Sequence, residues 1–140
     1  MKTNIDQFIV LPKGTVLYHG TSIKDRFYDP IGPFWVSDSE EVASVFAKKD
    51  RSGGGKPRIY VFELAGDIEL LWWESKADIE AWFEERGDEE SADMSPQELA
   101  DAVCNEGYDG WIIPHNYTVG GDIMICEPSS VLNLKRVKKA

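Results

Sequence analysis

The stretch that decides the fold reads Gly-Gly-Asp-Ile-Met-Ile-Cys-Glu-Pro and spans residues 120–128. Its apolar centre predicts a buried β-strand, and the acidic residue Asp122 stands at the start of that strand. A second stretch, Tyr-His-Gly-Thr-Ser at residues 18–22, closes another short apolar run with His19. An imidazole and a carboxylate are groups that catalytic sites use, and a fold can bring two strand ends together. The sequence therefore predicts a cleft between His19 and Asp122.

The composition predicts a single globular domain over residues 1–140. The chain has 140 residues, of which 42% are hydrophobic, and this is enough for one core. Its first residues lack the apolar core of a signal peptide, and no run reaches transmembrane length. The two cysteines are too few for a disulfide framework and lack metal-ligand spacing. We therefore expect a cytoplasmic protein with no metal site and no membrane partner.

Acidic residues dominate the charge of the chain, whose formal net charge is −10. This charge repels polyanions, so nucleic acid is disfavoured as a partner. The acidic residues concentrate between residues 74 and 106, where 12 of them accompany only Lys76 and Arg86. This segment is interpreted either as a solvated helical surface or as a docking surface for a basic protein partner.

Hydrophobic periodicity and turn residues predict an α+β fold, with short strands near both ends of the chain and helices between them. Ser37 and Glu40 read as a capping box before a first helix. Ser95 and Glu98 read as a second capping box, before a helix that Gly107 ends. The expected strands are 15–19, 34–36, 58–64, 68–72, 111–114, 122–126 and 131–137, the central helix is 76–85, the loops are 20–33 and 52–55, and a hairpin turn is 116–121.

The motif His19-Gly20-Thr21 resembles the His-Gly-Ser or His-Gly-Thr motif of the ADP-ribosyltransferase superfamily, in its poly(ADP-ribose)-polymerase-like branch. The resemblance implies an NAD-binding motif in which His19 binds the adenosine ribose and the backbone of Gly20 clamps the nicotinamide carboxamide. Glycine suits this task because no Cβ stands between the backbone and the ligand. The alternative for the same residues is an ordinary turn at the end of a strand.

Two aromatic residues, Trp35 and Phe46, follow the pattern of the same family. The resemblance implies that one ring on a strand and one on the next helix sandwich the cationic nicotinamide ring, which aromatic faces attract. Tyrosine is usual at both family positions, so this chain keeps the stacking and loses the phenol hydrogen bonds. Ser37, which lies between the two rings in the sequence, is also expected to bind NAD. Packing in the core is the alternative for both rings.

The third motif is Gly-Tyr-Asp-Gly at residues 107–110, followed by the strand that Asp122 opens. The family has its catalytic glutamate where this chain has Asp122, so the resemblance implies that Asp122 and His19 are the catalytic residues. Breaking the nicotinamide–ribose bond develops positive charge on the ribose, and a carboxylate bonded to the 2′-hydroxyl stabilises that charge. Asp109 is expected only to order a turn.

The resemblance implies an ADP-ribosyltransferase-like split β-sheet core with a few flanking helices. The implied activity is that of a mono-ADP-ribosyltransferase, which cleaves NAD, its substrate, and transfers ADP-ribose to a protein target without a metal. His115, Asn116 and Tyr117 precede the Asp122 strand and are the candidate contacts to the acceptor. A small acidic chain of this kind suits a bacterial or bacteriophage effector that acts in a host-cell cytoplasm.

Other functions stay open beside the transferase. Water in place of the acceptor gives an NAD glycohydrolase. Because aspartate is one methylene shorter than glutamate, a catalytically inactive NAD-binding protein is another alternative. A non-enzymatic alternative is an acidic inhibitor or decoy that docks on a basic partner through residues 74–106.

Overall fold

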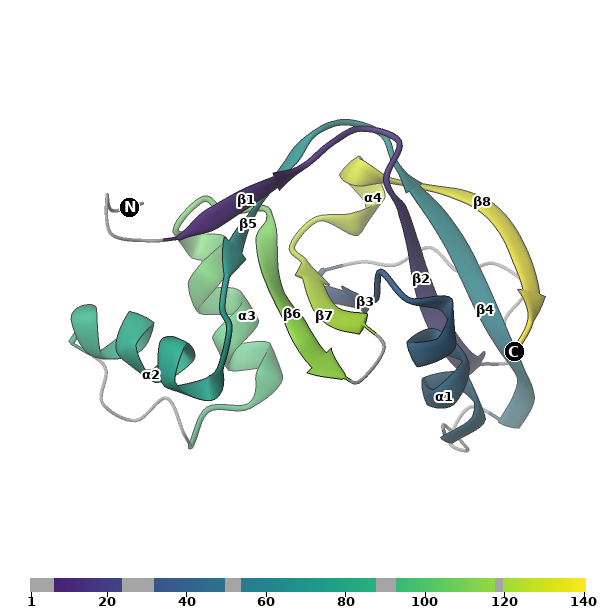
Figure 1. Cartoon of the computed structure of the whole chain (residues 1–140), viewed down its shortest axis with the longest axis horizontal. Coiled ribbons are helices and arrows are strands. Elements are labelled where there is room, and N and C mark those ends of the chain that lie inside the picture. Colours follow the sequence, from purple (N-terminus) through teal and green to yellow (C-terminus); the bar gives the residue numbers. More distant parts are fainter. Residues whose placement is uncertain (1–6, 24–31, 50–53, 88–92, 118–119) are drawn as a thin grey trace.

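The computed structural model of the chain describes residues 7–23, 32–49, 54–87, 93–117 and 120–140. These residues form a mixed α+β structure with two β-sheets and four helices, shown in Figure 1. The α+β class predicted from the sequence is confirmed at this level. The strands are β1 (Phe8–Leu11), β2 (Val16–Ile23), β3 (Phe34–Val36), β4 (Gly54–Leu64), β5 (Ile68–Trp72), β6 (Gly110–Tyr117), β7 (Gly120–Ile125) and β8 (Leu132–Lys139), and the helices are α1 (Glu40–Lys49), α2 (Lys76–Glu85), α3 (Pro96–Asn105) and α4 (Pro128–Val131).

The two sheets contribute side chains to one main core. The larger sheet has the strand order β1-β5-β6-β7-β3, and the smaller sheet has the order β2-β4-β8. Strands β5 and β6 pair in parallel, because the connection between them contains α2 and α3 and is long enough for a crossover. Leu17 and Tyr60 of the smaller sheet lie in one buried cluster with Leu70 and Ile123 of the larger sheet.

Helices α2 and α3 cover the other face of the larger sheet. Successive strand residues point to opposite faces, so Leu70 belongs to the cluster between the sheets and Leu71 packs with Trp82 of α2 and Val103 of α3. Helix α1 packs instead on the smaller sheet, where Ala43 contacts the cluster formed with Ile59. The result is a layer of helices on the outer face of each sheet.

Several predicted elements coincide with the observed ones. Strands β3 and β5 and helix α2 have the predicted bounds. Helix α3 begins with the predicted capping box, in which Ser95 and Glu98 each accept a hydrogen bond from the backbone of the other. Gly107 follows this helix with a φ of 93°, the left-handed conformation that favours glycine at a helix end.

Other local predictions are wrong because strand pairing overrides weak local signals. Strand β2 continues past residue 20, where a loop was predicted, since Gly20 and Thr21 pair with β4. Strand β4 already begins at Gly54, inside the second predicted loop. Strand β6 reaches Tyr117 and β7 begins at Gly120, so the hairpin connection is shorter than predicted. The sequence patterns did not predict β1 or α4.

The cap of α1 also differs from the prediction. The hydroxyl of Ser39, not Ser37, accepts the hydrogen bond from the backbone N–H of Val42 at 3.3 Å. Ser37 lies further back, where its backbone forms a bridge with Tyr18 of β2. The predicted capping box of Ser37 and Glu40 is therefore wrong, and the Ser37 side chain is available for another role.

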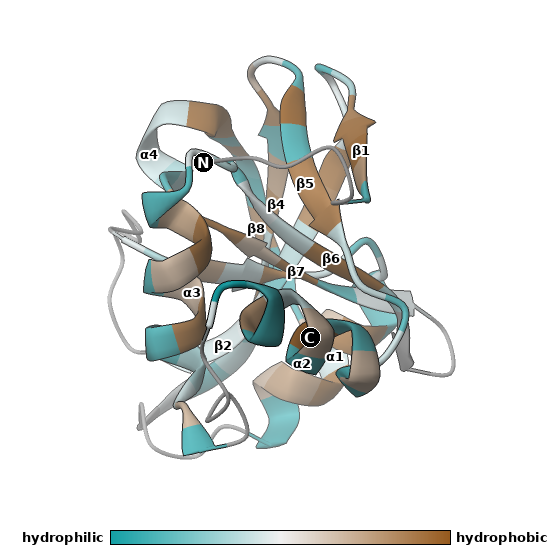
Figure 2. Cartoon of the chain, turned by 90° about the vertical axis from the view of Figure 1, so that its left-hand side faces the viewer, coloured by the Kyte–Doolittle hydropathy of each residue, from teal (hydrophilic) through white to brown (hydrophobic). Residues whose placement is uncertain are grey.

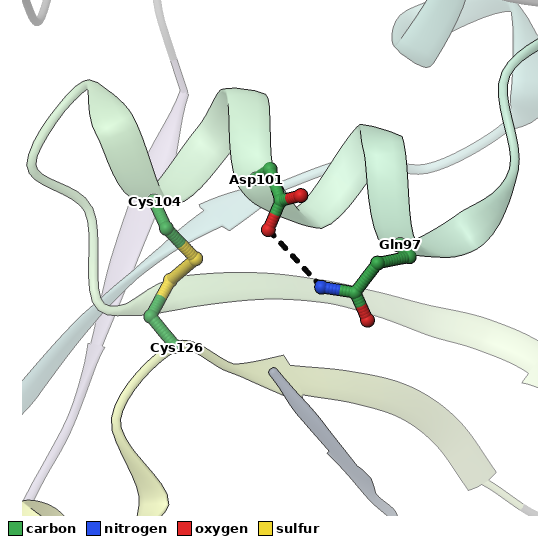
Figure 3. Close-up of a disulfide and its surroundings, with 4 residues drawn as sticks. All are labelled: Gln97, Asp101, Cys104 and Cys126. Carbon is green, nitrogen blue, oxygen red and sulfur yellow. Dashed lines mark hydrogen bonds between the residues drawn. A yellow bond between two sulfur atoms is a disulfide. The ribbon is translucent and has the colours of Figure 1, made fainter. Parts of the chain in front are cut away.

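Cys104 and Cys126 form a disulfide, which Figure 3 shows between the last turn of α3 and the end of β7. The count of only two cysteines gave no signal for this pairing, because it depends on a contact between elements separated by 22 residues. Disulfides persist mainly in oxidising compartments. The bond therefore weighs against the reduced cytoplasmic setting that the sequence led us to expect, and the compartment stays a prediction. None of the helices in the described ranges combines the length and apolar character needed to cross a membrane.

Candidate functional site

A cavity of about 350 Å³ lies where β2, β3, α1 and the start of β7 meet. The residues predicted from the sequence to bind NAD or to act on it reach this cavity from four separate elements and one connection. The rest of the cavity lining consists mostly of small and apolar side chains. The predicted residues that line it are His19, Gly20, Trp35, Ser37, Phe46 and Asp122, and the others are Tyr18, Val36, Val42, Ala43 and Pro96.

Strand β3 is the element that brings the two distant motifs together. On one side it pairs antiparallel with β7, with Trp35 opposite Met124. At its end, Ser37 exchanges two backbone hydrogen bonds of 2.8 Å with Tyr18 of β2. His19 follows Tyr18, and Asp122 lies near the matching end of β7. Pairing on both sides of β3 therefore places the imidazole and the carboxylate in the same cavity.

Asp122 lines the cavity at the start of β7. Burial raises the pKa of its carboxyl from 3.8 to about 6, because desolvation disfavours the charged form. Among the residues that the structure describes, none donates a hydrogen bond to this side chain. A desolvated carboxylate without a protein donor is suited to accept a hydrogen bond from a ligand hydroxyl.

The backbone just before Asp122 is held by two side chains from the β3–α1 connection. The buried hydroxyl of Ser37 donates to the carbonyl oxygen of Gly121 at 2.8 Å. The carboxylate of Asp38 accepts from the backbone N–H of Gly121 at 2.9 Å. The Ser37 hydroxyl also accepts from the N–H of Ser39 at 3.0 Å. These bonds fix the position of Asp122 and engage the hydroxyl that was predicted to bind NAD.

The imidazole of His19 is oriented by its neighbours on β3. Its Nδ1 lies 2.7 Å from the carbonyl oxygen of Trp35, and in the tautomer that donates this bond the other ring nitrogen carries the lone pair. The ring also packs on Phe34, with centroids 4.2 Å apart. His19 thus has a fixed ring plane at the cavity wall, as a residue that binds a ligand requires.

The two predicted stacking rings differ in how much of each ring the core holds. Phe46 is 46% exposed and belongs to none of the buried clusters. Trp35 is half-buried and packs at the edge of the α2–α3 cluster, with its ring centroid 6.3 Å from that of Trp111. Core packing accounts for part of Trp35 and does not account for Phe46. A large apolar ring exposed at a cavity is a common feature of ligand sites.

The glycines near the site serve the protein backbone rather than a close ligand. A Cβ on Gly20 would lie 1.7 Å from the carbonyl oxygen of Ala43, so glycine is needed where α1 crosses β2. A Cβ on Gly120 would lie 2.5 Å from the Cβ of Ser39, and one on Gly121 would lie 2.8 Å from the carbonyl oxygen of Ile113. The Gly20 backbone still lines the cavity, but close packing explains the residue type.

Three kinds of predicted residue lie elsewhere. Thr21 is 3% exposed and is not part of the cavity lining. The backbone of His115, Asn116 and Tyr117 forms the end of β6, and their side chains lie outside the described part of the structure. Asp109 was expected only to order a turn, and its carboxylate also joins two distant segments, since it accepts from the backbone N–H of Glu69 in β5 at 2.8 Å.

Two residues of the site were missed by the sequence patterns. Asp38 was given no role in the site, although its carboxylate holds the backbone of Gly121. Pro96 was given none either, although it lines the cavity from the start of α3. Both contacts join segments distant in the sequence, and no local pattern encodes them. Within the described ranges, no group of three or more His, Cys, Asp or Glu residues is placed to hold a metal ion.

Comparison with protein families, with curated proteins and with solved structures finds no match to this chain. The geometry of the cavity and the sequence motifs are therefore the basis for a functional assignment.

Proposed function

We propose that this protein is a mono-ADP-ribosyltransferase with an ADP-ribosyltransferase-like split-sheet fold, which cleaves NAD and transfers ADP-ribose to a protein. The observation that carries the proposal is the convergence of His19, Trp35, Phe46 and Asp122 on one cavity. These residues come from three separate motifs that lie far apart in the sequence, and each motif contributes at least one side chain to the lining. If these residues served only as a turn or as core packing, nothing would require them to line the same cavity.

Binding begins with the aromatic rings. Trp35 and Phe46 line the cavity from β3 and α1, and the cationic nicotinamide ring of NAD is a suitable guest for such rings. The oriented imidazole of His19 supplies a polar contact for a ribose hydroxyl, and the Gly20 backbone supplies one for the carboxamide. Holding the leaving group in one orientation lowers the entropic part of the barrier.

The chemical step is a displacement at the ribose carbon that carries nicotinamide. The carbon–nitrogen bond breaks and its electron pair leaves with nicotinamide, so positive charge develops on the ribose ring. The carboxylate of Asp122 accepts a hydrogen bond from the ribose 2′-hydroxyl, and this bond strengthens as the charge grows. A nucleophilic side chain of the target protein then forms the new bond to this carbon and releases its proton to solvent.

The electrostatics of Asp122 support this role. Its pKa of about 6 leaves most of the carboxyl ionised at neutral pH, in surroundings less polar than water. Fixed charge in such surroundings interacts more strongly with a developing charge than it does in water. The bonds that hold Gly121 fix the backbone from which this carboxylate projects.

The test uses the whole chain with biotin-tagged NAD and a bacterial lysate. The proposal expects a labelled lysate protein and release of nicotinamide. Asp122→Asn should abolish both signals, and the matched control Glu127→Gln should retain them, because Glu127 is an exposed acid beyond the opposite end of β7 and does not line the cavity. NAD consumption without a labelled protein would identify a glycohydrolase, and NAD binding without consumption would identify the inactive alternative.

A further inference from the structure

We propose that the outer edge of β1, together with the acidic wall of α2, is a docking surface for an extended, basic and hydrophobic segment of a partner protein. This surface lies at the opposite edge of the larger sheet from β3 and β7, which carry the NAD cavity. The inference does not depend on the enzymatic proposal, since its evidence comes from other residues.

The first observation is the character of the β1 edge. Its sequence is Phe-Ile-Val-Leu, without a charged residue, and Phe8 and Val10 are 49% and 54% exposed. Strand β1 is the first strand of the larger sheet, and among the described residues it pairs only with β5. Figure 2 looks onto this side of the molecule and shows β1 as mostly hydrophobic.

The second observation is a contrast with β8, an edge strand of the smaller sheet. Strand β8 carries four basic residues between Lys135 and Lys139, and its pairing has a register irregularity opposite Val61 and Phe62. Charged side chains, bulges and very short strands are among the devices by which proteins prevent unwanted pairing at a sheet edge. The four residues of β1 carry no charge and no bulge, so its short length is the device of this kind that they provide. The contrast with β8 makes β1 the edge that is more open to pairing with another strand.

The backbone of β1 is arranged to accept another strand. The backbone N–H of Trp72 donates to the carbonyl oxygen of Gln7 at 2.9 Å. Backbone groups in an antiparallel pair alternate in direction, so Ile9 and Leu11 also bond toward β5. The N–H and C=O groups of Phe8 and Val10 therefore point away from the sheet, where an added strand would meet them.

The third observation defines the chemistry of the partner. Phe8 pairs with Leu71, so its side chain lies on the sheet face that α2 covers. A hollow of about 280 Å³ between this face and α2 is lined by Gln7, Asp78 and Glu85 together with tryptophan rings. Gln7 also lines a second hollow, of about 460 Å³, with Phe8. Carboxylates beside apolar groups recognise a segment that alternates basic and apolar side chains.

A second copy of this chain fits the surface poorly. Pairing β1 with β1 of another copy would bring together two chains that each carry a net charge of −10. It would also bring two acidic α2 helices toward one another, and like charges across an interface are unfavourable. A basic partner gains from the same charges. The charge of the surface therefore favours a basic segment over self-association.

The test measures binding of an eight-residue peptide in which lysine alternates with valine, by fluorescence anisotropy over a range of salt concentrations. A matched peptide with glutamate in place of each lysine is the first control. We expect the basic peptide to bind, with an affinity that falls as salt rises, and the acidic peptide not to bind. Equal binding of both peptides, or of neither, would overturn the proposal.

Variants of the chain locate the binding. Val10→Pro removes the N–H that points outward and leaves the hydrogen bonds to β5 intact, a position at which an edge strand tolerates proline. Val10→Pro should lower the affinity for the basic peptide tenfold or more. Val10→Thr keeps the same branched shape and should leave the affinity nearly unchanged. The pair Asp78→Asn and Glu85→Gln should weaken binding severalfold and flatten its salt dependence. Unchanged affinity in Val10→Pro would contradict the proposal.

Two further measurements keep the test decisive. A peptide methylated on the backbone nitrogens that would face β1 blocks strand addition without a change to the protein. Its affinity for the parent protein should be as low as the affinity of the unmethylated peptide for Val10→Pro. NAD consumption should be the same in all of these variants, so failure of docking and failure of the enzymatic proposal are distinguishable. Sedimentation that shows a dimer of the parent and a monomer of Val10→Pro would assign the edge to a second copy and overturn the inference.

Discussion

Two regions of the larger sheet are stabilised by different interactions. At the β7–β3 end, directional hydrogen bonds from Ser37 and Asp38 hold the backbone before Asp122. Where α2 and α3 cover this sheet, they bury a cluster that includes Trp73, Trp82 and Trp111, and a disulfide closes the end of α3. In the first region, burial of the Asp122 carboxylate costs stability. In the second region, burial of apolar side chains adds stability. Loss of the Asp122 carboxylate in the first region should therefore lower activity without loss of stability, and substitutions in the second region should lower stability without loss of the cavity.

The largest expected effect is on turnover at Asp122. Asp122→Ala should lower kcat for NAD cleavage by roughly a hundredfold or more, the range for removal of one positioned electrostatic group. Because the rings and His19 make the ground-state contacts, the Kd for NAD should change only severalfold. Steady-state kinetics and calorimetric titration measure the two quantities. Asp122→Glu sharpens the test, since it keeps the charge and moves the carboxylate by one methylene; full activity in Asp122→Ala would end the catalytic assignment.

The disulfide should give the largest effect on stability. Cys104→Ser combined with Cys126→Ser should lower the free energy of unfolding by about 3 kcal/mol, the chain-entropy value for a loop of this size. Denaturant unfolding of the oxidised parent, the reduced parent and the double variant measures the change. Since the bond lies outside the cavity lining, NAD affinity under folding conditions should stay within about twofold of the parent. If the free energy of unfolding of the parent is the same with and without reductant, the disulfide does not form in solution.

The contrast between the two regions also explains what the sequence could predict. Ser95 with Glu98 and the bounds of α2 follow from local signals, and they are confirmed. Six of the residues lining the cavity were predicted from three motifs, and among them His19 and Asp122 do lie in one cavity, whereas the predicted Thr21 does not line it. The disulfide, the role of Asp38 and the edge strand β1 depend on contacts between distant segments. Local periodicity and spacing carry no information on such contacts, so these features required the structure.

The third prediction concerns the stability cost of the buried Asp122 carboxylate. Its pKa rises from 3.8 in the unfolded chain to about 6 in the folded chain, so the folded state binds more protons between these values. Stability from this group is therefore lost as pH rises from about 4 to about 6, and the cost persists above pH 6. Asp122→Asn should stabilise the protein by on the order of 2–3 kcal/mol at pH 7 and by little at pH 4. Thermal unfolding across this pH range tests the sign.

Removal of a stacking ring should have a moderate effect on binding. Phe46→Ala should weaken the binding of NAD by about 1–2 kcal/mol, the range for a desolvated contact between a cation and a ring. Because Phe46 is 46% exposed and lies outside the buried clusters, its loss should leave the melting temperature almost unchanged. Val45→Ala is the matched control, since Val45 is equally exposed on the same helix and does not line the cavity. If the two variants bind NAD alike, Phe46 is not a stacking ring.

The smallest expected effect on stability comes from the exposed charges of α2. Glu80→Lys with Glu84→Lys reverses two exposed charges that do not line the hollow beside Asp78. The free energy of unfolding should change by less than about 0.5 kcal/mol, because exposed charges contribute little favourable pairing. The same variant should slow association of the lysine–valine peptide and reduce its salt dependence, while the dissociation rate changes little, since these charges steer a basic partner without contacting it. Stopped-flow association rates at several salt concentrations separate the two rates. An unchanged association rate would indicate that Glu80 and Glu84 are only solvated charges and that any docking at β1 depends on Asp78, Glu85 and the strand edge alone.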